Sequence, residues 1–187
     1  RETEDHIEET RQLLNKAIEL DKDFLGARAW LAWTFLKVGD FATALDYYKL
    51  IEQDAEEKGD TDNLIRALHG LGEIYFIKDN NIEKALKTFE QSLSLSQSIN
   101  NKRAIGNSYA KLGPLYDMIN NPEKSINVFE NALDIFKTID LKVEMMSVIG
   151  NLGTDHFRNG NYNRSRMYYK QKLKIATESG VRVDIAN

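Results

Sequence analysis

The chain contains no cysteine among its 187 residues. This absence excludes disulfide bonds and thiolate metal ligands, and it fits a reducing compartment, so we expect a cytoplasmic protein. No apolar run approaches the roughly 18 residues that a membrane-spanning helix needs. Residues 1–5 are polar and acidic, so no signal peptide is visible. We therefore expect no membrane partner.

Residues that perform chemistry are also scarce. The three histidines are His6, His69 and His156, and their wide separation leaves too few ligands for a metal site. A glycine-rich phosphate loop, a nucleophile elbow and a metal-binding histidine pair are all missing from the sequence. The formal net charge of −4 and the isoelectric point near 5.5 give no general reason to expect nucleic acid. We therefore expect no catalysis, no cofactor, no metal and no nucleic acid partner.

A repeat of about forty residues organises the chain. Its markers are a leucine followed by a small residue, and a second small residue with an aromatic four positions later. The first pairs are Leu31 and Ala32, Leu71 and Gly72, Leu112 and Gly113, and Leu152 and Gly153, with leucine intervals of 40, 41 and 40. The second pairs are Ala44 and Tyr48, Ala85 and Phe89, Ser125 and Phe129, and Ser165 and Tyr169. A fixed period in this range indicates stacked supersecondary units.

Each period is predicted to form two helices, because the chain has only two prolines and is rich in helix formers. After a helix over 4–20, the expected helices span 24–38, 41–58, 61–78, 82–99, 102–119, a helix beginning at 122, 142–158 and 162–179. We expect a single repeat domain over 1–187. It would comprise the second helix of a truncated repeat (1–21), four repeats (24–59, 61–100, 102–140, 142–180) and the start of a further repeat (181–187). Both ends look cut from a longer protein.

The repeated residues predict how these helices pack. Residues four apart share a helix face, so Leu71 and Tyr75 lie on one stripe, and the small residue beside each leucine allows a neighbouring helix to approach closely. We expect the repeated aromatics to be core residues rather than ligand contacts. Pro114 falls inside a predicted helix, where it removes the hydrogen bond to the Ala110 carbonyl and is expected to cause a kink.

The pattern resembles the tetratricopeptide repeat. Leu71-Gly72, Tyr75, Ala85-Leu86 and Phe89 carry the resemblance, as do Leu112-Gly113, Tyr116, Phe129 and Ala132-Leu133. The period is longer than the 34 residues that are commoner in the family. This long-period variant is similar to the repeats of kinesin light chains, spindle-orientation scaffolds and bacterial signalling proteins. The resemblance implies an all-α fold, a right-handed superhelix of antiparallel helix pairs. It also implies that first helices line a concave groove, where a partner's peptide or helix binds.

Candidate groove residues are those on the first-helix faces opposite the leucine–aromatic stripe. They are Trp30, Trp33 and Lys37, with Leu36 at the edge; Arg66, His69, Glu73, Phe76 and Ile77; Asn107, Lys111, Asp117 and Met118; and Asn151, Thr154, Phe157 and Arg158. Tryptophan is enriched at binding hot spots, although packing against the missing first helix of the preceding truncated repeat would also explain this pair. Asn107 and Asn151 could hydrogen-bond a peptide backbone, because an amide both donates and accepts. Ordinary solvation or helix capping is the favoured explanation of the two asparagines, and peptide contact is the alternative.

Charge is distributed unevenly along the chain. Residues 1–62 hold sixteen acids and eight bases, whereas residues 158–182 hold seven bases and one acid. Arg166, Lys170 and Lys174 fall on one face of the last expected helix. We interpret them as a solvated face, or as a complement to acidic surface elsewhere in the array, rather than as a nucleic-acid site.

The sequence favours the first of three functions, and the other two stay open as alternatives. The first is a protein-interaction module that binds a peptide or helix in its groove, as part of a larger bacterial signalling protein. The second is a regulatory sensor that gates an attached cyclase, kinase or DNA-binding domain. The third is a structural module that self-associates, for instance as a dimer, through exposed apolar ends.

Overall fold

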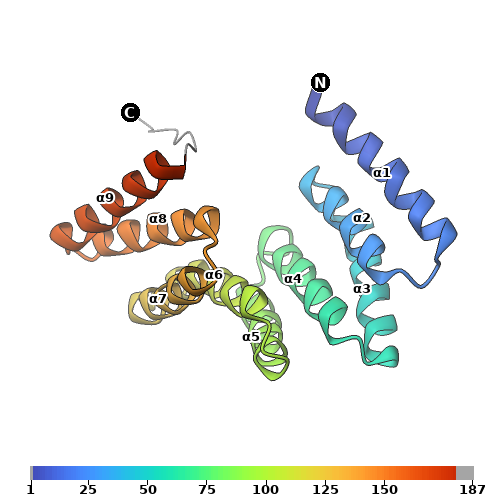
Figure 1. Ribbon diagram of the computed structural model, residues 1–187. Coiled ribbons are helices and arrows are strands. Elements are labelled where there is room, and N and C mark those ends of the chain that lie inside the picture. The colour runs from blue at the N-terminus through green and yellow to red at the C-terminus, as the bar shows by residue number, and fades with distance from the viewer. Residues whose placement is uncertain (1, 180–187) are drawn as a thin grey trace. The chain divides into compact units, whose positions relative to one another are not determined.

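A computed structural model describes residues 2–179, with side chains from residue 6 onward. This part of the chain forms nine helices and no strand (Figure 1). They are α1 (Glu2–Leu20), α2 (Leu25–Lys37), α3 (Phe41–Lys58), α4 (Thr61–Ile77), α5 (Ile82–Ser98), α6 (Lys102–Met118), α7 (Pro122–Thr138), α8 (Lys142–Arg158) and α9 (Tyr162–Ser179). The expected helices are therefore present, and their ends differ from the predicted ones by at most two residues. The expected further repeat at 181–187 lies outside the described residues.

A left-handed residue follows each helix from α2 to α8, once per half period. These residues are Gly39, Gly59, Asn80, Asn100, Asn120, Asp140 and Gly160. In most of these turns, the next amide N–H reaches back five residues and closes the helix end. The backbone amide of Asp40 donates to the Phe35 carbonyl at 3.0 Å, and the backbone amide of Asn161 donates to the His156 carbonyl at 2.8 Å. The repeat thus has the same backbone turn after first and second helices.

The turn between α4 and α5 holds one extra residue. There the Asn81 amide donates to the Tyr75 carbonyl at 2.9 Å, which lies six residues back instead of five. This insertion accounts for the single interval of 41 residues in both marker series.

Side-chain caps begin several helices. Asp40, Asp60, Asn101 and Asn121 each accept a hydrogen bond from the backbone amide three residues later. Pro122 occupies the first turn of α7 directly after the Asn121 cap, as predicted. Helix α6 continues unbroken through Pro114, so this proline does not end the helix, and a bend there stays a prediction.

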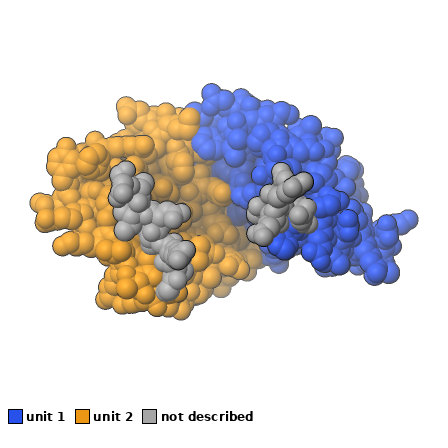
Figure 2. All heavy atoms as spheres, turned by 90° about the horizontal axis from the view of Figure 1, so that it is seen from above, with its two compact units in different colours: residues 1–95 blue, residues 96–187 orange. Residues whose placement is uncertain are grey.

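The chain divides into two compact units, residues 1–95 and 96–187 (Figure 2). In unit 1, fully buried Leu31, Ile51, Leu71 and Ile74 come from α2, α3 and α4. Glycine sets the helix separation in this unit. A Cβ on Gly72 would lie 2.6 Å from the Phe89 ring, so only glycine permits this approach of α5 to α4.

Unit 2 repeats this arrangement around α6, α7 and α8. Its core contains Phe129, Leu133 and Phe136 from α7 with Ile149 and Leu152 from α8. The Phe129 ring would lie 2.2 Å from a Cβ on Gly113, and the Phe136 ring 2.5 Å from one on Gly106. The close approach predicted from the leucine–glycine pairs is therefore present. The assignment of the whole chain to one repeat domain stays a prediction.

Tyr169 departs from the expectation that the repeated aromatics are core residues. Tyr48, Phe89 and Phe129 are 3%, 2% and 1% exposed, but Tyr169 is 44% exposed. Its ring still covers Gly153, where a Cβ would lie 2.9 Å away. No described helix packs on its outer side in the way that α8 packs on α7. None of the helices in residues 2–179 is both long and apolar enough to cross a bilayer.

Candidate protein-binding surfaces

Two tryptophans form an exposed aromatic pair on α2. Trp30 is 53% exposed and Trp33 is 43% exposed. Their rings meet edge to face, with centroids 5.6 Å apart. The Lys37 ammonium lies 5.3 Å from the Trp33 ring centre, within the range of a cation–π contact. The first three predicted groove residues therefore share one exposed surface.

The pair is exposed because α1 packs against another side of α2. The Arg11 guanidinium donates to the Thr34 hydroxyl at 3.0 Å and lies 4.1 Å from the centre of the Phe35 ring. Leu36 is 6% exposed, so its expected place at the groove edge is wrong: it faces the core.

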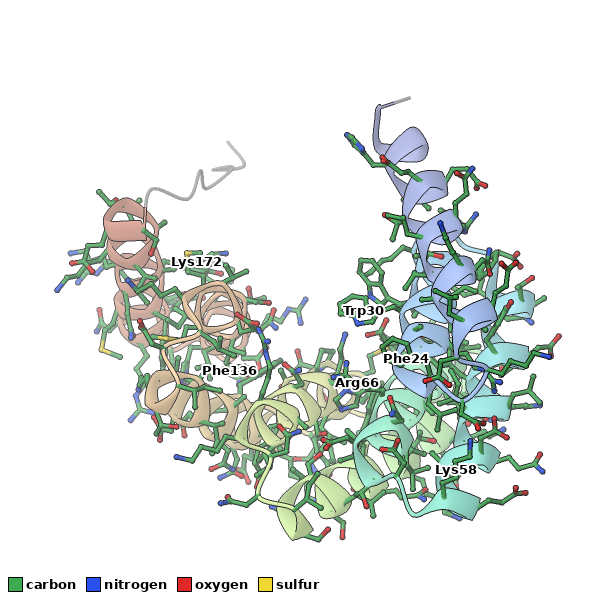
Figure 3. The ribbon with its side chains drawn as sticks, turned by 45° about the vertical axis from the view of Figure 1, so that its right-hand side comes forward. Phe24, Trp30, Lys58, Arg66, Phe136 and Lys172 are labelled. Carbon is green, nitrogen blue, oxygen red and sulfur yellow. The ribbon has the colours of Figure 1, made fainter. Side chains whose placement is uncertain are left out.

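The α4 candidates lie on a helix that packs against α2. Figure 3 shows Trp30 and Arg66 projecting from the same side of unit 1. His69, Glu73 and Phe76 are half-buried, and the His69 ring centre lies 6.2 Å from that of Phe89. These side chains give the surface a mixture of apolar area and charge.

In unit 2, the predicted residues border a cavity of about 240 Å³ between α6 and α8. Asn151, Thr154, Arg158, Asp117 and Met118 line it, together with Pro114, Phe129 and Asp155. Arg158 donates to the Asp117 carboxylate at 2.9 Å, which ties α8 to α6. Asn107 is half-buried and Lys111 is exposed on α6, and neither lines this cavity. Phe157 lies elsewhere, against Tyr162 with ring centres 5.3 Å apart.

The cavity contains a buried carboxyl group that sequence reasoning missed. Asp155 is 3% exposed and accepts a hydrogen bond from the Ser125 hydroxyl at 2.8 Å. Burial, and then the neighbouring Asp117 carboxylate, raise the pKa of Asp155 to about 6, against the opposing effects of Ser125 and Arg158. The repeat held a signal for this group, because Asp155 aligns with Thr34, Ile74 and Leu115, which are all buried.

His156 is a second buried titratable group, and its burial was not predicted from the sequence. It aligns with the aromatics Phe35, Tyr75 and Tyr116, is 2% exposed and stacks on Tyr168 at 5.4 Å. Neither ring nitrogen has a hydrogen-bond partner. Burial, then the positive charge of Arg164, lowers the pKa of His156. The imidazole thus replaces an aromatic ring in the stripe. The described residues contain no group of three or more side chains suited to a metal.

The family follows from the sequence match over the repeats. The sequence matches the family described as Tetratricopeptide repeat over residues 27–98 and 63–138, which together cover more than half of the chain. The chain belongs to the tetratricopeptide repeat family. No curated protein matches the sequence.

Solved structures with the same fold are distant in sequence. BtubC (BKLC) from P. vanneervenii is 17% identical with a TM-score of 0.78, and the match covers 100% of this chain and 80% of that one. A STAND protein with a tetratricopeptide repeat sensor from Pyrococcus horikoshii is 21% identical with a TM-score of 0.72, covering 91% and 28%. Aspartyl phosphate phosphatase F from Bacillus subtilis is 13% identical with a TM-score of 0.77, covering 86% and 41%. The chain thus spans less than half of the last two proteins.

These similarities confirm the predicted fold class, an all-α superhelix of antiparallel helix pairs. Tetratricopeptide repeats are protein-interaction modules, and proteins built from them are generally non-catalytic scaffolds. This chain is therefore a protein-interaction module by family and by fold.

Proposed function

We propose that this tetratricopeptide repeat chain binds an extended peptide or helix of a partner protein on the first-helix surface of unit 1. The observation that carries the proposal is the exposed pair of Trp30 and Trp33. Tryptophan offers a large apolar area with one hydrogen-bond donor, and such residues dominate the energy of many interfaces. A surface with two of them, about half exposed, favours a partner's apolar side chains.

Charge around the pair suggests what accompanies those apolar side chains. Lys37 and Arg66 are exposed on the two helices, whereas Glu73 is half-buried. A partner segment with acidic residues beside its apolar anchors would meet these cations. Phe76 and His69 would extend the apolar contact along α4.

Unit 2 is proposed to bind by a similar mode on its own. Asn107 and Asn151 would hydrogen-bond a peptide backbone, since each amide offers a donor and an acceptor. Lys111 and Arg158 would contribute charge, with Arg158 first leaving Asp117. Phe157 is the weakest of the proposed contacts, because its ring packs on Tyr162 and not beside Asn151.

Tryptophan fluorescence tests the proposal directly, because Trp30 and Trp33 are the only two tryptophans in the chain. Peptides selected from a display library against the intact protein would be titrated while emission and acrylamide quenching are recorded. Binding on this surface is expected to shift the emission to the blue and protect both rings from the quencher. A selected peptide that binds by calorimetry and leaves emission and quenching unchanged would move the interface elsewhere.

A pair of variants separates this surface from general apolar stickiness. The double change Trp30→Ala and Trp33→Ala is expected to weaken peptide binding at least tenfold, about 1.4 kcal/mol or more. Leu50→Ala is the matched control, because Leu50 is also 56% exposed but lies on α3. Both variants should keep the wild-type circular dichroism and melting temperature. Equal losses of affinity in the two variants would contradict the proposal.

A regulatory sensor is the second candidate function. It is favoured by the similarity to a STAND protein whose tetratricopeptide repeats are described as a sensor, of which this chain spans 28%. In that case the binding surface would be the same, and the bound peptide would control an attached domain. Activity of the full-length parent protein that does not change with a bound peptide would count against this function.

A further inference from the structure

Two carboxyl groups in unit 2 stand at positions that the other repeats fill with uncharged residues. Asp155 on α8 is 3% exposed, and its counterparts in the other repeats are Thr34, Ile74 and Leu115. Asp117 on α6 is half-buried, and its counterparts are Leu36, Phe76 and Phe157. A buried charge destabilises a folded protein unless it is well paired. The packing of the repeat alone therefore does not explain this pair of aspartates.

A proline adds a third departure from the repeat pattern beside the same two carboxyl groups. Pro114 lies inside α6, where a proline removes a backbone hydrogen bond and is unfavourable. The cavity of about 240 Å³ between α6 and α8 is lined by Pro114, Asp117 and Asp155, together with Asn151 and Thr154. Residues that break a local rule at a cost in stability are expected at functional sites. Three such residues around one cavity indicate a binding site there.

The cavity holds more negative than positive charge. Among the described residues that line it, Arg158 alone is cationic, and its guanidinium donates to the Asp117 carboxylate at 2.9 Å. Asp155 accepts from the Ser125 hydroxyl and forms no ion pair with a residue that the structure describes. When both aspartates are ionised, one negative charge is left without a cation. Charge complementarity therefore favours a positively charged occupant.

The size of the cavity suits one side chain rather than a whole small molecule. Its volume of about 240 Å³ lies below the roughly 300–1,000 Å³ of pockets that hold such molecules. The Arg158 side chain is 66% exposed, and an exposed ion pair contributes little to stability. A second cation can therefore replace Arg158 on Asp117. Asn151, the residue proposed above to bind a peptide backbone, lines the same cavity.

We propose that this cavity binds a lysine or arginine side chain of the partner peptide. The cation pairs with Asp155 and takes the place of Arg158 on Asp117, while Asn151 holds the adjoining backbone. A basic side chain thus neutralises a carboxyl group whose burial is unfavourable in the free protein. The inference rests on the proposed function for unit 2, and it is independent of peptide binding on α2 and α4 of unit 1.

Capped amino acids test the site without depending on a particular peptide. Nα-acetyl-lysine methylamide and its arginine equivalent carry the cation, and Nα-acetyl-norleucine methylamide is the uncharged match. Each would be titrated into the ¹⁵N-labelled protein at pH 8, where Asp155, with its pKa of about 6, is ionised. The cationic probes are expected to shift the backbone amide signals of Asn151, Thr154 and Asp155 and to saturate. The norleucine probe should leave these signals unchanged.

Variants distinguish a specific cation site from general attraction to an acidic protein. Asp155→Asn is expected to weaken binding of the cationic probes at least about tenfold, because it removes the buried charge partner. Arg158→Gln should strengthen binding about two- to fivefold by freeing Asp117, which is the size of effect of an exposed ion pair. Asp134→Asn is the matched control, because it removes an exposed carboxylate on α7 and should leave the affinity unchanged. Circular dichroism would check that each variant keeps its fold.

Three results would each overturn the inference. They are no saturable shift with either cationic probe at millimolar concentrations, equal shifts with the norleucine probe, or equal losses of affinity in Asp155→Asn and Asp134→Asn. The proposed function would survive them, because the tryptophan surface is tested by fluorescence with selected peptides. A selected peptide that shifts the Asn151 signal where the cationic probes fail would show that unit 2 binds its partner through another chemistry.

Discussion

Replacing Asp155 by asparagine is expected to stabilise the protein at neutral pH. Asp155 is buried between α6, α7 and α8 and must lose its proton there above pH 6. An asparagine side-chain oxygen can still accept from Ser125, and its NH₂ group can donate to the Asp117 carboxylate. The variant thus keeps the existing hydrogen bond and removes a buried negative charge beside a second carboxylate.

The size of the effect follows from the pKa of Asp155, which rises from 3.8 to about 6 on folding. This difference corresponds to about 3 kcal/mol, because one pKa unit is about 1.4 kcal/mol. Because folding raises the pKa, the protonated Asp155 of the wild type contributes stability that is fully present below pH 3.8. This contribution is lost as pH rises through 6. The adjoining cavity of about 240 Å³ has room for solvent that would screen the charge, so we expect a gain of about 1–2 kcal/mol for Asp155→Asn at pH 7.

Urea unfolding at several pH values measures this gain. The advantage of Asp155→Asn over the wild type should grow between pH 4 and pH 6 and then level off. Asp134→Asn is the matched control, since Asp134 is an exposed carboxylate on α7 and pairs with Lys137 at 2.9 Å. The effect of Asp134→Asn on the free energy of unfolding should stay below about 1 kcal/mol and should not grow between pH 4 and pH 6 as that of Asp155→Asn does. An Asp155→Asn variant that is less stable at pH 7, or equally advantaged at pH 4, would refute the reasoning.

Three further changes follow from the packing. Gly113→Ala should cost about 1–3 kcal/mol in urea unfolding, because its Cβ would lie 2.2 Å from the buried Phe129 ring. His156→Phe should add about 1–2 kcal/mol by removing two unpartnered nitrogens, measured by thermal melting. Its advantage should grow as pH falls below 6.5, since the lowered pKa of His156 means that the wild type loses stability there. Asp60→Ala should cost about 1 kcal/mol in urea unfolding by leaving the Asn63 amide without its cap.

Each of these changes has a matched control. At Gly150 an added Cβ would have the flexible end of the Lys172 side chain as its nearest neighbour, with the ammonium 3.0 Å away, so Gly150→Ala should be neutral or stabilising. If Gly113→Ala were no worse, the close helix approach would not explain the glycine. Asp60→Asn keeps a capping oxygen and should behave like the wild type. A His156→Phe protein less stable than the wild type at pH 7 would mean that the larger ring does not fit.

The helices and their pairing could be predicted from the sequence because their determinants are local and recur. Caps such as Asp40 and Asn121 and left-handed residues such as Gly160 act within a few residues of the chain. Glycines such as Gly113 recur opposite an aromatic one helix later. Most of these signals recur from period to period, so the repeat could be recognised without knowing which helices touch.

The surface residues could be predicted only in part. Helical phase correctly placed Trp30 and Trp33 on an exposed face, because exposure there depends on one helix. The same phase put Leu36 at the groove edge, yet Leu36 is buried, since a neighbouring helix covers that side. The Phe157 ring likewise packs against Tyr162 of the next helix, which the phase of α8 alone could not predict.

By itself the sequence determined the all-helical fold, its period, its helix ends and its family. Only the tertiary structure decided which side chains share an environment. The raised pKa of Asp155 needs Asp117 from α6 beside it and enclosure by α7, and the unpartnered His156 needs Tyr168 of α9 over its ring. Burial, desolvation and charge pairing depend on distances between segments far apart in the chain, whereas a repeat pattern records only spacing along it.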